Sequence, residues 1–300
     1  WGLLDDEDRS LLAGYIINKF RGDDTILAPG LEELTRRTGL RHLGTLPWLR
    51  GVWLDGEDTL AVGRWRAEAS RDGSLRVAVV RLPRISNATD VDALAQEPGV
   101  EVLVTTDPRA VLSADLAVLP GSRSTLSDLA WLRSAGIADA IEQRAAQGLP
   151  VLGICGGFQM LGHAIRDGVE ADETGDGLGL LPVDTQFHDE KVLARTSSTW
   201  RGQPVDGYEI HHGICAPRPG AEAFLDGVHE GSCWGTMMHG SLESDEFRRA
   251  FLGEVAARAG SSWTPDPGVP GMAARREQMI DTLADACEEH LDIDALLRVG

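Results

Sequence analysis

A cysteine stands where a short apolar run gives way to a helical pattern. Residues 151–154 are typical of a buried strand, Cys155 follows directly, and helical periodicity then continues to Ile165. Gly153-Ile-Cys-Gly-Gly157 has the G-x-nucleophile-x-G form of a strand–turn–helix elbow, whose sharp turn needs glycines because neighbouring backbone lies close. A thiol at a helix N-terminus is favoured as the thiolate. The pattern therefore favours a cysteine nucleophile over a small buried core cysteine.

Eight histidines are the candidates for the base that such a nucleophile needs. His239 follows an apolar strand and precedes a glycine, so it can project into a crevice, although a core histidine is an equal interpretation from the residues alone. His211 and His212 form a second candidate pair, and consecutive strand residues point to opposite faces, so we expect at most one of them to enter the site. No H-x-H or H-x-x-x-H spacing occurs with a matching carboxylate, and the sequence predicts no metal site.

The elements around the cysteine alternate between strands and helices, which predicts a parallel, doubly wound α/β sheet of the flavodoxin-like kind. We expect strands over 75–80, 100–104 and 116–119, and helices over 90–96 (capped by Asn87 or Thr89), 126–134 and 137–147. Ligands of such sheets bind at the carboxyl ends of the strands. The loop at 120–122 and the Cys155 elbow are therefore expected to meet at that edge.

The remaining segments predict additions to this sheet and a second, smaller α/β region. Short β-like runs over 181–187, 192–197, 205–211 and 233–238 predict antiparallel additions, and helices are expected over 244–258 and 273–290. Near the beginning of the chain, strands over 13–17 and 43–47 flank a helix over 31–38 that closes on Gly39. Because the chain opens on Trp1 rather than Met, we expect this to be the last βαβ unit of a domain whose start is missing.

Composition limits the possible partners and the compartment. The formal net charge of −19 argues against a nucleic-acid or anionic membrane surface, because phosphate binding needs clustered Lys and Arg. The four cysteines show no C-x-x-C spacing, which indicates a reducing compartment and favours the cytoplasm. No apolar run approaches the ~20 residues of a membrane-spanning helix, and no signal-peptide pattern is present.

The elbow and several other motifs resemble a known family. Gly153-Ile-Cys-Gly-Gly-Phe-Gln159 is similar to the C-x-G-x-Q elbow of class I (triad-type) glutamine amidotransferases. Further motifs resemble the cobyric acid synthase family of cobalamin biosynthesis, and together they cover nearly the whole chain: Asn18–Asp23, Leu46–Trp48, Arg81–Asn87, Leu119–Thr125, Asp128–Leu132, Gly207–His211 and Gly235–Gly240.

This resemblance implies a role for each matching residue. The nucleophile would be Cys155 and the catalytic histidine His239, while Gln159 and His211 would help to hold the substrate glutamine. The backbone of Gly121 and Ser122, with the N–H of Gly156, would form the oxyanion hole. The ammonia released would serve the ATP-dependent amidation of corrin carboxylates, with cobyrinate a,c-diamide as the corrin substrate.

Two features depart from the family pattern. Many class I amidotransferases carry a glutamate two positions after the histidine, but Ser241 stands there, so we expect a Cys–His dyad, with Glu243 as a possible substitute. No G-x-x-x-x-G-K-[ST] motif occurs, so ATP and Mg²⁺ are expected for the full-length enzyme rather than for this chain. Asn18 and Lys19 either approach a nucleotide or form a plain turn at a strand end.

The predicted organisation has four segments: 1–50 as the remnant of the ATP-dependent synthetase domain, 51–74 as a linker, 75–258 as the amidotransferase domain, and 259–300 as a loop and C-terminal helix. We expect the chain alone to catalyse only the glutaminase half-reaction. The alternatives are an amidotransferase of the cobyrinate a,c-diamide synthase type, a stand-alone cysteine hydrolase, for which His163 is a poor base, and a non-catalytic scaffold.

Overall fold

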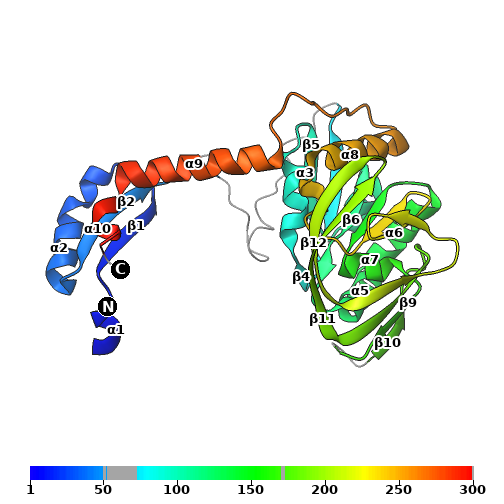
Figure 1. Cartoon of the computed structure of the whole chain (residues 1–300), viewed down its shortest axis with the longest axis horizontal. Helices are drawn as coiled ribbons and strands as arrows, with labels where there is room; N and C mark the ends of the chain where they lie inside the picture. The colour runs from blue at the N-terminus through cyan, green and yellow to red at the C-terminus, as the bar shows by residue number, and fades with distance from the viewer. Residues whose placement is uncertain (50–51, 53–72, 170–172, 299–300) are drawn as a thin grey trace. The chain divides into compact units, whose positions relative to one another are not determined.

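The chain folds as two compact units. A computed structural model describes residues 1–49, 52, 73–169 and 173–298 (Figure 1). One unit consists of Trp1–Leu54 with Ala273–Gly300, and the other consists of Asp55–Met272. The predicted linker over 51–74 lies almost wholly outside the described residues. The division into a synthetase remnant and an amidotransferase domain stays a prediction.

The larger unit is built on a seven-stranded, mainly parallel sheet. In sheet order its strands are β13 (Glu222–Phe224), β14 (Gly227–Glu230), β15 (Cys233–Thr236), β8 (Val151–Ile154), β6 (Leu116–Leu119), β3 (Leu75–Val80) and β5 (Val100–Thr105). The five strands from β15 to β5 are parallel, and β13 and β14 are antiparallel additions at one edge. All four residues of β8 are buried, as expected of a strand covered on both faces. The predicted α/β fold class is confirmed.

Helices pack on both faces of this sheet (Figure 1). They are α3 (Asp92–Gln96), α4 (Pro108–Ser113), α5 (Thr125–Ser134), α6 (Ile137–Ala146), α7 (Gly156–Leu161) and α8 (Asp245–Ala259), with short 3₁₀ turns η3 (Ala88–Val91) and η4 (Ser241–Glu243). The helix α6 packs against both α4 and α5, while α3 and α8 each pack against η4. The short βα loops leave the carboxyl ends of β3, β6, β8 and β15 at one edge of the sheet, and that edge carries the site.

A four-stranded sheet flanks the elbow. Its order is β10 (Glu173–Asp176), β9 (Ala164–Asp167), β11 (Val183–Trp200) and β12 (Gln203–Pro217), and a further two-residue pair joins β4 (Ile85–Ser86) to β7 (Gly121–Ser122). The long hairpin of β11 and β12 confirms the predicted antiparallel additions.

Two details of the prediction were wrong. The run at 233–238 was expected among the antiparallel additions, but β15 is a parallel neighbour of β8, because a short apolar run does not reveal its pairing partner. The helix after the elbow ends at Leu161 instead of reaching Ile165, since Gly162 is extended and the chain turns into β9.

The smaller unit contains the βαβ arrangement expected near the start of the chain. Its β1 (Gly14–Phe20) pairs in parallel with β2 (Arg41–Pro47), and α2 (Ala28–Thr38) between them ends at Gly39, which has φ 73. The unit also holds α1 (Asp6–Ser10), α10 (Ile293–Leu296) and nearly all of α9 (Met272–His290). The N–H of Asp292 donates to the carbonyl of Leu43, so the C-terminal residues pack on β2.

None of the helices in the described part of the chain combines the length and the apolar character needed to cross a membrane.

Candidate active site

Cys155 occupies a strained turn between β8 and α7. Its φ of 50 and ψ of −112 lie outside the regions that L-residues normally adopt, as the nucleophile-elbow pattern requires. The flanking glycines are needed for close backbone approach, because a Cβ at Gly157 would lie 2.0 Å from the carbonyl oxygen of Leu119. A Cβ at Gly156 would lie 2.8 Å from the backbone nitrogen of Ser122. The thiol is 7% exposed, at the carboxyl edge of the sheet.

His239 lies beside this thiol and is held by a carboxylate. Its Nδ1 is 2.7 Å from Oδ2 of Asp90, and the other carboxylate oxygen accepts a hydrogen bond of 2.9 Å from the N–H of Gly240. The His239 side chain is 1% exposed and that of Asp90 is 2% exposed. The Cys155 thiol is close enough to the imidazole to contribute to its raised pKa. A nucleophile, a base and a group that orients the base therefore lie in series.

Tyr208 supports the imidazole from β12. The backbones of Tyr208 and His239 exchange two hydrogen bonds of 3.0 and 2.8 Å, and their rings are stacked with centroids 5.5 Å apart. Burial, with the nearby negative charge of Asp90, raises the pKa of Tyr208 to about 12. The ring therefore remains a neutral wall for the histidine at physiological pH.

The charge on His239 depends on Asp90. Burial alone would lower the pKa of the imidazole, but the charge of Asp90, its hydrogen bond and the contact with Cys155 together raise that pKa to about 11. Asp90 thus favours the charged, imidazolium form of His239. A cation beside the sulfur stabilises a thiolate, which is the nucleophilic form of cysteine.

The expectation of a Cys–His dyad was therefore wrong in its geometry. Ser241 does follow two positions after the histidine, where it begins η4, but the orienting carboxylate comes from Asp90, 149 positions upstream. Glu243 is not the residue that holds the ring nitrogen. Asp90 was missed because we predicted that 90–96 was helical throughout, whereas the short η3 turn after β3 brings this carboxylate to the edge where β15 also ends.

The prediction of a helix cap near residue 90 also failed. Asn87 precedes η3 in a left-handed conformation, with φ 49, and its side chain makes no capping hydrogen bond. Instead, Asn87 lines the cavity that contains Cys155.

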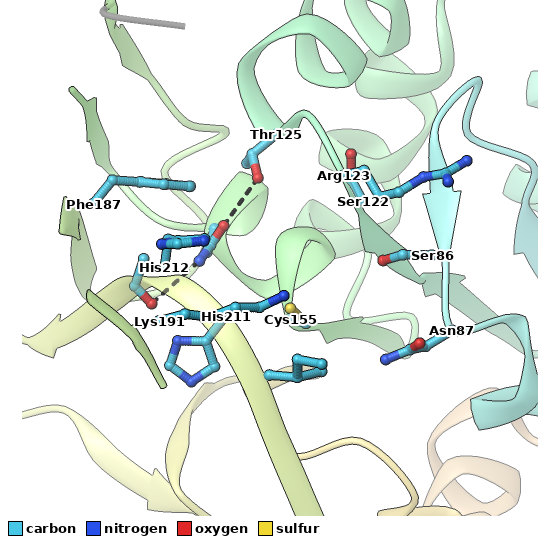
Figure 2. A pocket seen from close by; sticks show the side chains of 13 residues that line it. Ser86, Asn87, Ser122, Arg123, Thr125, Cys155, Phe187, Lys191, His211 and His212 are labelled. Carbon is cyan, nitrogen blue, oxygen red and sulfur yellow. Dashed lines mark hydrogen bonds between the residues drawn. The ribbon is translucent and has the colours of Figure 1, made fainter. Parts of the chain in front are cut away.

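The cavity has a volume of about 260 Å³ and lies between the elbow, the β4–β7 pair and the β11–β12 hairpin (Figure 2). Gln159 is fixed in its wall, since its Oε1 accepts 3.0 Å from the hydroxyl of Thr125 and its Nε2 donates 3.5 Å to the carbonyl of Gly213. The side chain of His211 is 7% exposed, and its Nε2 lies 2.9 Å from a carboxylate oxygen of Glu209.

His211 and His212 both line this cavity, contrary to the expectation that only one could. They lie where the β11–β12 ladder shifts its register, between Phe187 opposite Gly213 and Val192 opposite His211.

The residues predicted for the oxyanion hole meet at the elbow. Ser122 lines the cavity and lies against Gly156, and β7, which contains Gly121 and Ser122, pairs with β4. The Ser122 hydroxyl donates 2.7 Å to the buried carboxylate of Asp128 and accepts 3.0 Å from the N–H of Ser124. Burial raises the pKa of Asp128, a shift that its hydrogen bonds partly oppose.

The other predicted positions lie outside this cavity. Asn18 and Lys19 belong to β1 in the smaller unit and are exposed, and Lys19 has φ 57 within a strand that continues to Phe20. His163 is also absent from the cavity wall. Among the residues with described positions, no group of three or more His, Cys, Asp or Glu could hold a metal ion.

A cysteine on a strained elbow, with a histidine held by a carboxylate at the carboxyl edge of a parallel sheet, defines a triad-type cysteine enzyme of the α/β class. The chain belongs to the CobB/CobQ-like glutamine amidotransferase domain family, whose model matches residues 76–247.

Curated relatives support this assignment over the whole chain. The cobyric acid synthase of Cutibacterium acnes is 61% identical over 305 residues, which cover 100% of this chain and 63% of that protein. The cobyric acid synthase of Mycolicibacterium gilvum is 52% identical, over 98% of this chain and 59% of that protein. The chain thus spans about three-fifths of the length of these relatives. A solved structure titled "Crystal structure of glutamine amidotransferase" has a TM-score of 0.48 and 19% identity over 61% of this chain and 98% of that chain, and the assignment does not depend on it.

Proposed function

We propose that this chain releases ammonia from glutamine through a thioester on Cys155, as the glutaminase part of a cobyric acid synthase. The observation that carries the proposal is the buried series of Cys155, His239 and Asp90, in which Asp90 holds the imidazole and Cys155 lines a cavity of about 260 Å³. Family membership supplies the substrate, since the matched domain is a glutamine amidotransferase domain.

The first chemical step is attack of the Cys155 thiolate on the side-chain carboxamide of glutamine. The tetrahedral oxyanion would be stabilised by backbone N–H groups of the Gly121–Ser122 segment and of Gly156. Loss of one such donor typically costs roughly 2.7–4 kcal/mol. The imidazolium of His239 then protonates the departing ammonia, which leaves a γ-glutamyl thioester and a neutral imidazole.

The second step returns the enzyme to its starting state. The neutral imidazole of His239 takes a proton from water, which attacks the thioester and releases glutamate. Through its hydrogen bond to Nδ1, Asp90 keeps the other ring nitrogen of His239 directed toward the sulfur in both steps. It also stabilises the positive charge on the imidazole whenever that charge forms.

The use of the ammonia is proposed from the relatives, which are named cobyric acid synthases. In the full-length enzyme it would feed the ATP- and Mg²⁺-dependent amidation of carboxylates on a corrin such as cobyrinate a,c-diamide. Because the sequence lacks a P-loop motif, we expect this chain alone to catalyse only the hydrolysis of glutamine. Residues 1–50 would then be the end of the synthetase domain, and Asn18 and Lys19 would lie near its nucleotide. Four free cysteines favour a reducing compartment, for which we propose the cytoplasm.

The test is labelling with 6-diazo-5-oxonorleucine, a glutamine mimic that alkylates nucleophiles, followed by peptide mass spectrometry. We expect one adduct on Cys155 that glutamine prevents and that is lost in His239→Ala. If iodoacetamide labels Cys155 but the glutamine mimic does not, the thiol is reactive without a glutamine pocket, and a cysteine hydrolase becomes the better assignment. We expect this chain to form the adduct on Cys155 and, by itself, to fail to amidate a corrin.

A further inference from the structure

The cavity that Cys155 lines contains a lysine with no acidic partner among the described residues. Lys191 lines the cavity, and no described aspartate or glutamate forms an ion pair with its ammonium. None of the cavity's lining residues is acidic. Figure 2 shows the Lys191 side chain extending toward Cys155, whereas the guanidinium of Arg123, the other strong base in the wall, is directed away from it.

A break in the hairpin places Lys191 in this position. Along β12 only two positions separate His211 from Gly213, but the residues opposite them on β11 are Val192 and Phe187. The extra residues form a bulge that ends at Lys191, and the carbonyl of His188 within it lies 3.1 Å from Nδ1 of His212. Bulges next to active sites commonly redirect a side chain. Here the redirected side chain carries the ammonium.

The chain uses lysine sparingly, which makes this position more notable. Lys19 and Lys191 are the only lysines among 28 Lys and Arg residues. Lysine presents a compact point charge with three rotatable donors on a flexible stem, while arginine presents a rigid planar fork. Lys191 therefore brings a small, movable charge to the cavity rather than the planar fork of an arginine.

The burial of the cavity fixes the orientation of the substrate. Cys155 is 7% exposed and lies deep, so the carboxamide of glutamine must enter first and the amino-acid head must remain toward the opening. Lys191 is exposed, so its side chain enters the cavity from the opening. An ammonium on this side matches the α-carboxylate, which is the anionic group of glutamine.

We propose that Lys191 binds the α-carboxylate of the substrate and thereby restricts the site to amides that carry a free α-carboxylate. This inference rests on the proposed glutaminase function and adds a specificity residue to it. The lysine acts on binding rather than on the reacting carbonyl. Its removal should therefore affect substrates with the carboxylate and leave substrates without it unchanged.

The kinetic test compares glutamine with 4-aminobutanamide, which is glutamine without its α-carboxylate. Lys191→Met keeps the aliphatic stem and removes the charge. We expect kcat/KM for glutamine to fall about 10- to 100-fold, the range typical of a lost hydrogen bond to a charged group, while kcat/KM for 4-aminobutanamide stays within twofold. Arg123→Met is the matched control, and should leave the preference for glutamine intact.

Two outcomes would overturn the inference. If Lys191→Met slows both amides equally and also slows the alkylation of Cys155 by iodoacetamide, the lysine acts on the thiol. If it changes neither amide, the lysine is a solvated surface group. The proposed function fails separately, when the unaltered chain hydrolyses no glutamine and gives no adduct with the glutamine mimic.

A second readout needs no turnover. Acetylation by an N-hydroxysuccinimide ester can be followed at both lysines by peptide mass spectrometry, with Lys19 as an internal reference that is exposed in the other unit. Saturating glutamine should slow the labelling of Lys191 several-fold, and 4-aminobutanamide should not. Equal labelling of Lys191 with and without glutamine contradicts the inference.

Discussion

Two buried cysteines lie at opposite ends of two neighbouring parallel strands, and the side chains around them differ. Cys155 follows the carboxyl end of β8, while Cys233 begins β15 and pairs with Val151 at the amino end of β8. Their exposed fractions are similar, 7% and 3%. Burial raises the pKa of the Cys233 thiol to about 11, despite the opposing charge of Arg144. Cys155 instead has a histidine and a carboxylate beside it.

The comparison shows that burial does not decide whether a cysteine is a nucleophile. At the amino end of the sheet, Arg144 is occupied by backbone carbonyls, including those of Ala114 and Pro150, and supplies no proton-transfer group. At the carboxyl end, the loops after β3 and β15 bring Asp90 and His239 together. In parallel sheets the βα loops at that end build the site, whereas the amino end is used for packing.

Replacing each of the two cysteines by serine should give the largest difference in activity. Cys155→Ser should lower glutamine hydrolysis by roughly 10⁴- to 10⁶-fold, because the nucleophile is lost. Cys233→Ser should retain kcat within a few-fold and lower only the unfolding midpoint. Ammonia release and thermal unfolding of both variants measure this. Equal losses of activity would mean that the two cysteines do not differ as described.

Removal of the orienting carboxylate gives the next largest effect. Asp90→Asn should lower kcat about 10²- to 10⁴-fold, because the imidazole loses the partner that fixes its tautomer and stabilises its charge. The control is Glu97→Gln, which alters another buried carboxylate, one that pairs with Arg248 and Arg249. It should reduce stability without a comparable loss of kcat. If Asp90→Asn retained full activity, Asp90 would have no catalytic part and the site would be a Cys–His dyad.

The same pair predicts a pH-dependent contribution to stability. The folded pKa of His239, about 11, lies above the 6.5 of an unperturbed histidine, so the stabilisation is complete below pH 6.5 and is lost as the pH rises toward 11. The free energy of unfolding of the unaltered chain should therefore exceed that of Asp90→Asn most near pH 6, and the difference should shrink steadily toward pH 10. Urea titrations at several pH values measure it, and a constant difference would contradict the assignment.

The smallest expected effect concerns the segment opposite the elbow. The carboxylate of Asp128 accepts a hydrogen bond of 2.7 Å from the hydroxyl of Ser122 and one of 3.2 Å from the backbone N–H of Arg84. Asp128→Asn keeps the shape and weakens both bonds, so kcat should fall by less than about tenfold while the alkylation of Cys155 by iodoacetamide stays unchanged. A change in alkylation would show that the substitution disturbs the elbow itself.

The sequence predicted the parts of the site that depend on local pattern. Glycine spacing and an apolar run, visible within a few residues, predicted the elbow at Cys155, whereas His239 was an even choice from the residues alone and was singled out by the family resemblance. The parallel sheet followed from the alternation of strands and helices. These features need no knowledge of distant partners.

The features that were missed depend on long-range pairing. Asp90 becomes part of the site only because η3 ends where β15 ends, although the two residues lie 149 positions apart. Lys191 enters the cavity because a bulge interrupts the β11–β12 ladder, and no residue pattern marks that register shift. The parallel pairing of β15 with β8 is likewise a property of the assembled sheet.

The central claim is that Cys155 carries the γ-glutamyl group during glutamine hydrolysis. The most direct measurement adds hydroxylamine to the reaction with glutamine and assays γ-glutamyl hydroxamate, which forms when the amine intercepts a thioester. We predict that the hydroxamate forms at the expense of glutamate, and that Cys155→Ser abolishes both products. Release of ammonia without any hydroxamate, and with activity retained in Cys155→Ser, would contradict the account.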